Sequence, residues 1–144
     1  MKTNIIINFQ IEALHYWKDA ATVAPAVAFL QHGHRHMFHI CCKKEITDAD
    51  REIEIILFKR SIQAYLQSKY GEFIAAVKRR LAHEPESKEI KYIQVFSHCD
   101  FRGRSCEMIS QELMTEFDLD YCSVMEDGEN GAECIKTPHR LIEI

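Results

Sequence analysis

The segment Leu30–Cys42 reads LQHGHRHMFHICC and contains four closely spaced histidines, His32, His34, His36 and His39. In an extended strand, side chains two residues apart leave the same face. The sequence therefore predicts a strand from about Leu30 to Ile46, one face of which would hold three histidines followed by an apolar run: His32, His34, His36, Phe38, Ile40 and Cys42. The alternative is an ordinary strand with exposed polar residues.

A second segment, Thr3–His15, could complete a metal site. Two imidazoles on one strand face commonly supply nitrogen ligands to Zn²⁺, with a third histidine from another element and water at the open position. Thr3–His15 alternates between apolar and polar residues and predicts a half-buried strand, whose inner face holds Ile5, Ile7, Phe9, Ile11 and Ala13. His15 ends that face. Alone it would be a hydrogen-bonded core residue, but beside a histidine pair it is a candidate third ligand.

The composition is that of one globular domain spanning residues 1–144. A length of 144 residues corresponds to about one domain, and 47% hydrophobic residues suffice for a core. The net charge is −4, and the basic cluster Lys78-Arg79-Arg80 is typical of a solvated helix face. These features argue against a nucleic-acid partner.

No segment approaches the roughly 20 apolar residues that a membrane helix needs. The N-terminal sequence MKTNIIINFQ lacks the apolar stretch and cleavage site of a secretion signal. The six cysteines show no C-x-x-C spacing, which indicates reduced thiols. We therefore expect a cytoplasmic protein without a membrane partner.

Two helices are predicted after these strands. The first follows Thr47–Asp50, which resembles a capping box, and ends near Gly71; its apolar stripe comprises Ile55, Phe58, Ile62, Tyr65 and Leu66. The second begins at the N-cap Ser105, and its stripe comprises Cys106, Ile109, Leu113 and Phe117. The sequence leaves Glu72–Arg104 open, because residues 73–82 could be helical and residues 91–96 could be extended.

The last part of the sequence predicts a hairpin. Tyr121–Glu126 reads as a strand, the next residues contain the turn signals Asp127-Gly128 and Asn130-Gly131, and Ala132–Ile135 returns. The predicted order is strand, strand, helix, helix, strand, strand. We therefore expect an α+β fold, an antiparallel four-stranded sheet with two helices on one face.

These segments resemble the family of 6-pyruvoyl-tetrahydropterin synthase and 6-carboxytetrahydropterin synthase, the latter an enzyme of the deazaguanine pathway. In that family a pattern like F-x-A-A-H ends the first strand with a zinc ligand, and here Ile11, Ala13, Leu14 and His15 match it. A second pattern, H-G-H-N-Y-x-V-x-V, supplies two further ligands from the next strand. The resemblance implies the tunnelling fold, with chains assembled as trimers or hexamers.

Two registers of this chain fit the second pattern. One uses His32 and His34 and keeps the glycine between them, but places His36 at the tyrosine of the family. The other uses His34 and His36, places Phe38 at the tyrosine and keeps the apolar parity intact. We prefer the second register, so the resemblance implies zinc ligation by His15, His34 and His36, with His32 and His34 as the alternative pair.

The resemblance continues in the second half of the chain. A motif T-[TA]-E-N opens the second helix of the family, where this chain has Ser105-Cys106-Glu107, and a strand end V-x-x-E carries a glutamate that anchors the pterin, where this chain has Glu126. Glu126 also shares the apolar parity of Val124, where an unpaired carboxylate is costly. Two N–H donors of a 2-amino-4-oxo ring would satisfy it. Otherwise, Glu126 belongs to a solvated acidic turn.

The chain departs from the family in its proton-transfer groups. The family has a cysteine just before the paired histidines and an Asp-His pair after the first helix, but Val23–Gln31 has no cysteine and Lys69–Lys91 has no such pair. The nearest substitute is His98-Cys99-Asp100, since an imidazole or an activated thiol can move protons near neutral pH. The alternative for this triplet is a polar loop.

The resemblance implies a zinc-dependent carbon–oxygen lyase acting on a pterin such as dihydroneopterin triphosphate. Glu107 and Glu126 would bind the ring, and His98 or Cys99 would transfer protons. The departures favour a second hypothesis, a protein that binds a pterin, purine or nucleotide without chemistry. A third is a structural or regulatory protein with pH-sensitive surface histidines.

Overall fold

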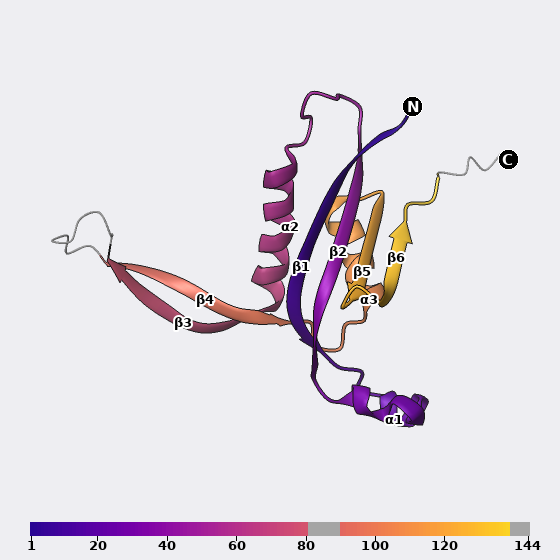
Figure 1. Cartoon of the computed structure of the whole chain (residues 1–144), viewed down its shortest axis with the longest axis vertical. Helices are drawn as coiled ribbons and strands as arrows, with labels where there is room; N and C mark the ends of the chain where they lie inside the picture. The colour runs from indigo at the N-terminus through magenta and orange to yellow at the C-terminus, as the bar shows by residue number, and fades with distance from the viewer. Residues whose placement is uncertain (81–89, 139–144) are drawn as a thin grey trace.

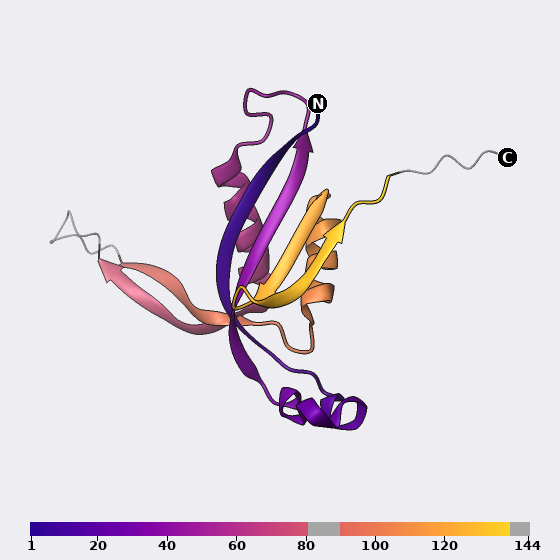
Figure 2. The same ribbon diagram turned by 45° about the vertical axis from the view of Figure 1, so that its right-hand side comes forward.

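The computed structural model describes residues 1–80 and 90–138 and has a mixed α+β architecture (Figures 1 and 2). Its elements are β1 (Thr3–His15), α1 (Ala20–Val23), η1 (Pro25–Gln31, a 3₁₀ helix), β2 (His34–Ile46), α2 (Ile55–Tyr70), β3 (Gly71–Arg80), β4 (Ile90–Asp100), α3 (Cys106–Phe117), β5 (Tyr121–Glu126) and β6 (Asn130–Ile135). Within the described residues, six strands form one sheet in the order β3-β4-β1-β2-β5-β6. The α+β class is confirmed, whereas the expected four-stranded sheet is wrong.

The two additional strands come from the segment that the sequence left open. β3 covers residues 73–80, so the helical alternative for 73–82 is wrong up to Arg80; residues 81 and 82 lie outside the described residues. Pairing with β4, whose sequence is rich in β-branched and aromatic residues, decides in favour of a strand. The hairpin projects from the sheet (Figure 1). The end of β4 runs parallel to β1, where Cys99 pairs with Ala13 and Asp100 with Leu14.

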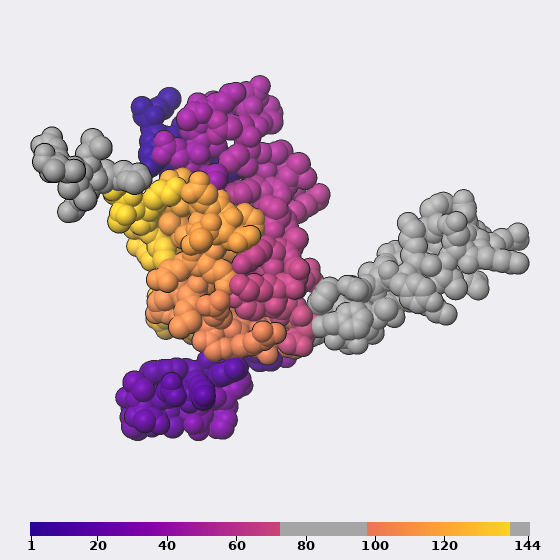
Figure 3. Space-filling model, turned by 180° about the vertical axis from the view of Figure 1, so that it is seen from behind, coloured from indigo at the N-terminus to yellow at the C-terminus, as the bar shows by residue number. Residues whose placement is uncertain are grey.

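Helices α2 and α3 cover the same face of the sheet, as Figure 3 shows from behind. This arrangement is the one expected from the sequence. The alternating residues of the strands and the helical stripes meet between the two layers, in a buried core that includes Ile7, Phe9, Phe38, Ile40, Ile62, Leu66, Ile109, Leu113 and Val124. Because the apolar parity of β1, β2 and β5 faces this layer, the same face positions the histidines at the ends of β1 and β2.

The two longer helices begin in different ways. In α3, the Ser105 hydroxyl accepts a hydrogen bond from the N–H of Met108 at 3.2 Å, so the predicted N-cap is confirmed. In α2, Glu54 is the N-cap, and the capping box predicted at Thr47–Asp50 is wrong. The Thr47 hydroxyl donates to Glu52 at 2.8 Å instead, which folds this segment into a loop before the helix. Within the described part of the chain, no helix combines the length and apolar character needed to cross a bilayer.

The segment between β1 and β2 has secondary structure of its own. It contains α1 and η1, and it forms a lobe at one end of the sheet (Figures 1 and 3). Pro25 opens η1, where its missing N–H costs nothing. Because η1 continues to Gln31, β2 begins at His34, and His32 lies outside the strand. The predicted row of three histidines in one strand is therefore wrong at His32.

The hairpin of β5 and β6 is confirmed. Asp127 and Gly128 adopt φ values of +54° and +71°, and the N–H of Glu129 donates to the carbonyl of Glu126 at 2.9 Å. Positive φ at both central residues is the conformation for which Asp-Gly is favoured in tight hairpins. The other turn signal, at Asn130, lies at the start of β6.

A carboxylate on α3 ties the two helices together. Glu112, 11% exposed at its side chain, accepts hydrogen bonds from the hydroxyls of Tyr65 at 3.0 Å and Tyr70 at 2.7 Å. Lys69 and Arg104 lie 3.2 and 3.0 Å from the same oxygen, Oε1. Burial alone would raise the pKa of Glu112, but these hydrogen bonds outweigh it and the pKa is lowered. Glu112 is therefore ionised at neutral pH and bonded to four groups.

Replacing Glu112 with glutamine should destabilise the fold by about 1.5–3 kcal/mol, the usual effect of losing hydrogen bonds to a charged group. The free energy of unfolding, measured in urea at pH 7, tests this expectation. Glu116→Gln, at an exposed position of the same helix, is the matched control and should stay near the wild type. Equal stability of the two variants would contradict the role given to Glu112.

Candidate metal centre

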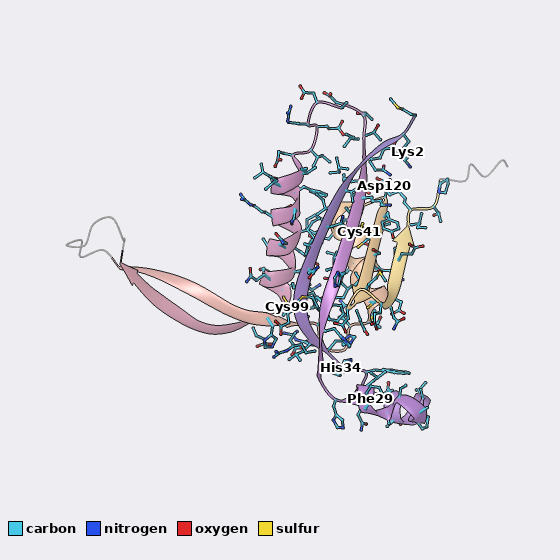
Figure 4. The ribbon with its side chains drawn as sticks, in the orientation of Figure 1. Lys2, Phe29, His34, Cys41, Cys99 and Asp120 are labelled. Atoms are coloured by element: carbon cyan, nitrogen blue, oxygen red, sulfur yellow. The ribbon has the colours of Figure 1, made fainter. Side chains whose placement is uncertain are left out.

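The ends of β1 and β2 bring three histidines together on the core face of the sheet. The two strands are antiparallel, and their last pair is His15 opposite His34. His36 lies two residues further along β2 and therefore on the same face as His34. His15 is buried, while His34 and His36 are half-buried. Figure 4 shows His34 at the end of the sheet, beside the lobe that carries Phe29.

The three rings are close enough to share one metal ion. Each histidine offers one ring nitrogen, and these three nitrogens all lie within 4.8 Å of one another. The ring centroids of His15 and His34 are 4.5 Å apart, those of His34 and His36 are 5.0 Å apart, and those of His15 and His36 are 5.4 Å apart. The ring of Phe38 packs edge-to-face against the rings of His15 and His36, with centroid distances of 5.2 and 5.8 Å, and supplies an apolar contact to the cluster. The preferred register, with His34 and His36 as the strand pair, is the one in which the rings meet.

Each of these histidines uses its Nδ1 atom in a hydrogen bond to an oxygen. The Nδ1 of His15 lies 3.1 Å from the carbonyl oxygen of Arg104, and that of His34 lies 2.9 Å from the carbonyl oxygen of His32. The Nδ1 of His36 lies 2.7 Å from a carboxylate oxygen of Asp127. Carbonyl oxygens and ionised carboxylates only accept, so all three Nδ1 atoms donate. In a neutral imidazole the lone pair is then on Nε2, the form that a metal ion requires.

The Nε2 atom of His15 is buried and has no hydrogen-bond partner within the described structure. Oε1 of Glu126 lies 3.1 Å from this atom, but the two do not have the geometry of a hydrogen bond. Burial lowers the pKa of His15, and the nearby His34 and His36 act in the same direction, against the raising effects of Arg104 and Glu126. A neutral, buried nitrogen lone pair is costly unless something binds it. A metal ion would satisfy this atom.

Glu126 extends the histidine cluster to the next strand. It lies opposite Phe38 in the pairing of β2 and β5, and its Oε2 is 3.4 Å from the Nε2 of His36. Its Oε1 is 3.8 Å from the thiol of Cys106 at the first turn of α3. Burial, with the adjacent charge of Glu126, raises the pKa of Cys106 to about 12. The thiol is therefore protonated at neutral pH and can donate to the carboxylate.

A cavity of about 370 Å³ opens beside the cluster. His15, His34 and Glu126 line it together with Trp17 from the lobe and Glu107 from α3. Glu107 is exposed, whereas Glu126 is half-buried. Both glutamates that the sequence indicated as ligand-binding residues thus border the same cavity as two of the three histidines.

The triplet His98-Cys99-Asp100 lies elsewhere. His98 and Cys99 line a different hollow, of about 420 Å³, beside β1 and α2. The Cys99 thiol is buried, lies 3.8 Å from the carbonyl oxygen of Leu66, and has its pKa raised to about 11 by burial. Asp100 accepts a hydrogen bond from the N–H of Arg102 at 2.8 Å. None of the triplet lines the cavity at the histidines, and its catalytic role stays a prediction.

Two residues of the centre were not identified from the sequence. Asp127 was assigned to the hairpin turn, although its place directly after Glu126 was a usable signal. Cys106 was assigned to the apolar stripe of a helix, and nothing in its sequence context indicates that it faces Glu126. The carbonyl of Arg104 belongs to the backbone, so sequence alone could not reveal its contact with His15.

Comparison of the chain with models of known protein families and with curated proteins finds no match.

The lowered pKa of His15 predicts a pH-dependent stability of the metal-free protein. The unfolded side chain takes up a proton near pH 6.5 and the folded one only at lower pH, so this contribution is complete above pH 6.5 and is lost as the pH falls. Urea unfolding in the presence of a chelator, at pH 7.5 and 5.5, should show a loss of stability in the wild type. The loss should be smaller in His15→Asn, and an identical loss in both proteins would contradict the assignment.

Proposed function

We propose that the chain holds one zinc ion through His15, His34 and His36 and acts on a pterin-type molecule in the adjacent cavity, as a divergent member of the pterin synthase family named above. The observation that carries the proposal is the common state of the three imidazoles. Each has its Nδ1 bonded to an oxygen, which leaves Nε2 as the metal-binding atom. Outer hydrogen bonds of this kind are a general property of histidines that bind metals.

Zinc is the metal that these donors suit best. Three neutral imidazoles are the protein ligands of catalytic zinc sites that keep one position for water or substrate. Imidazole also binds copper, nickel and iron. A set of three neutral imidazoles with one open position is nevertheless typical of zinc. The cysteine thiol near the centre, Cys106, is directed to Glu126 and is protonated, so it is not a competing ligand.

The chemistry divides between the metal and the carboxylates. Zinc bound here would polarise a hydroxyl or carbonyl oxygen of the substrate as a Lewis acid. Glu126 would accept two N–H donors from the 2-amino-4-oxo edge of a pterin in a charge-assisted, bidentate contact. Glu107, exposed at the edge of the same cavity, would contribute a further carboxylate. Cys106 would hold a proton beside Glu126.

The order of elements supports the tunnelling fold as part of this proposal. The order strand, strand, helix, helix, strand, strand is found in β1, β2, α2, α3, β5 and β6. The hairpin of β3 and β4 would be an addition to that pattern. We also propose that the chain assembles into a homo-oligomer, a trimer or hexamer, on the basis of the family resemblance alone.

A second candidate is a pterin-, purine- or nucleotide-binding protein that performs no reaction. The placement of His98 and Cys99 away from the cavity favours it, because the expected proton-transfer groups do not line the place where the substrate would lie. Under this candidate the metal and Glu126 would serve only to bind the ligand.

Metal analysis of the purified protein should find about one zinc per chain, as a three-histidine centre implies. His36→Ala removes one ligand nitrogen and should lose most of the zinc. His32→Ala is the matched control, because it removes an imidazole from the neighbouring sequence but keeps the backbone carbonyl to which His34 donates. Loss of zinc in His32→Ala and retention in His36→Ala would show that the other register is correct.

The carboxylate of Glu126 should set the affinity for a pterin. Glu126→Gln should retain zinc but bind 7,8-dihydroneopterin about 10–100-fold more weakly, the loss expected from a charge-assisted bond. Calorimetry measures this affinity, with Glu129→Gln, in the same hairpin, as the control of equal charge change. A wild-type protein that neither binds nor converts the pterin would contradict the proposed substrate class.

Conversion of dihydroneopterin triphosphate by the wild type separates the two candidates. An enzyme should release product, followed by mass spectrometry, whereas a binding protein should return the compound unchanged after denaturation.

A further inference from the structure

We propose that Asp127 is the positioning residue of the metal centre: it holds His36 in the tautomer and orientation that present Nε2 to the ion. This inference rests on the proposed metal site and adds a residue that the ligand pattern itself does not contain. His15 and His34 donate to backbone carbonyl oxygens, and a side-chain substitution does not remove a backbone carbonyl. His36 alone among the three is held by a side chain, at 2.7 Å.

The backbone of Asp127 is fixed by its place in the hairpin. Its N–H donates to the carbonyl of Met37 at 2.8 Å, and its Oδ1 accepts from the N–H of Met37 at 3.0 Å. Asp127 thus continues the ladder between β2 and β5 for one residue beyond the last paired residue, Glu126, with a carboxylate oxygen replacing a backbone carbonyl. The left-handed conformation of Asp127, with φ of +54°, makes this geometry possible.

The two carboxylate oxygens have separate tasks. Oδ1 is bound to the backbone of Met37, so Oδ2 is directed at the Nδ1 of His36. The side chain of Asp127 is 50% exposed and belongs to no part of the buried core, so packing does not explain its contacts. A carboxylate that accepts from a ligating histidine fixes the tautomer, orients the ring and makes Nε2 a better donor to the metal.

The substitution Asp127→Asn separates these effects from the turn. Asparagine is also favoured at positive φ, so the hairpin should form as in the wild type. Its side chain offers one oxygen and one NH₂ group, and it cannot accept from both Met37 and His36 with different atoms. If the oxygen stays with Met37, the NH₂ group faces Nδ1 and favours the tautomer protonated on Nε2, which is closed to the metal.

Zinc affinity, measured by competition with a chelator, should fall about 10–100-fold in Asp127→Asn, the usual cost of losing an outer partner of a metal ligand. Asp127→Gly keeps the left-handed turn, removes the carboxylate and should lose affinity in the same range. Glu129→Gln removes an equal charge from the same turn and should bind zinc as the wild type does. Wild-type affinity in both Asp127 variants would overturn the proposal.

A second readout does not depend on the metal. Nitrogen-15 NMR of the metal-free wild type should show His36 protonated on Nδ1, and Asp127→Asn should shift the proton towards Nε2. A wild-type His36 protonated on Nε2 would overturn the role of Asp127. If the wild type binds no zinc, the proposed function fails, but the tautomer of His36 still decides whether Asp127 positions the ring.

Discussion

The register of β1 against β2 is the constraint on which the rest of the centre depends. Antiparallel pairing of His15 with His34 places three imidazoles at one end of the core face, while Ile7, Phe9, Phe38 and Ile40 bury the other parts of the same face. A slip of β1 by one residue would send its own side chains, His15 among them, to the opposite face and away from His34 and His36. The burial of the apolar residues therefore also fixes the histidines, and the position of the site follows from the folding of the sheet.

The polar groups around the histidines are arranged for a cation. The Nδ1 atoms donate to two backbone carbonyls and one carboxylate, and the carboxylate of Glu126 lies close to the Nε2 atoms of His15 and His36. Carboxylate oxygens and neutral imidazole nitrogens with free lone pairs are both electron-rich, so a cation bound by the imidazoles would stabilise this arrangement. The buried Nε2 of His15 is the clearest sign of this, since the described structure gives it no hydrogen-bond partner.

Alternation in the sequence was sufficient to predict β1, the apolar face of β2 and the parity that favoured His34 with His36. It could not predict where β2 begins, because η1 takes up the residues before His34 through its own backbone bonds. It also missed the strand character of residues 73–80, which depends on pairing with a distant segment, β4. Asp127 and Cys106 are brought to the centre by a turn and a helix packing on the sheet, contacts between residues far apart in the chain.

The most direct test of the central claim is X-ray absorption spectroscopy at the zinc edge of the purified protein. We expect three imidazole nitrogens at about 2.0–2.1 Å from the metal, with oxygen as the remaining ligand. The chain also contains six cysteines, whose thiolates are the alternative ligands for zinc. A sulfur scatterer at about 2.3 Å would place the zinc on thiolates and contradict the histidine centre.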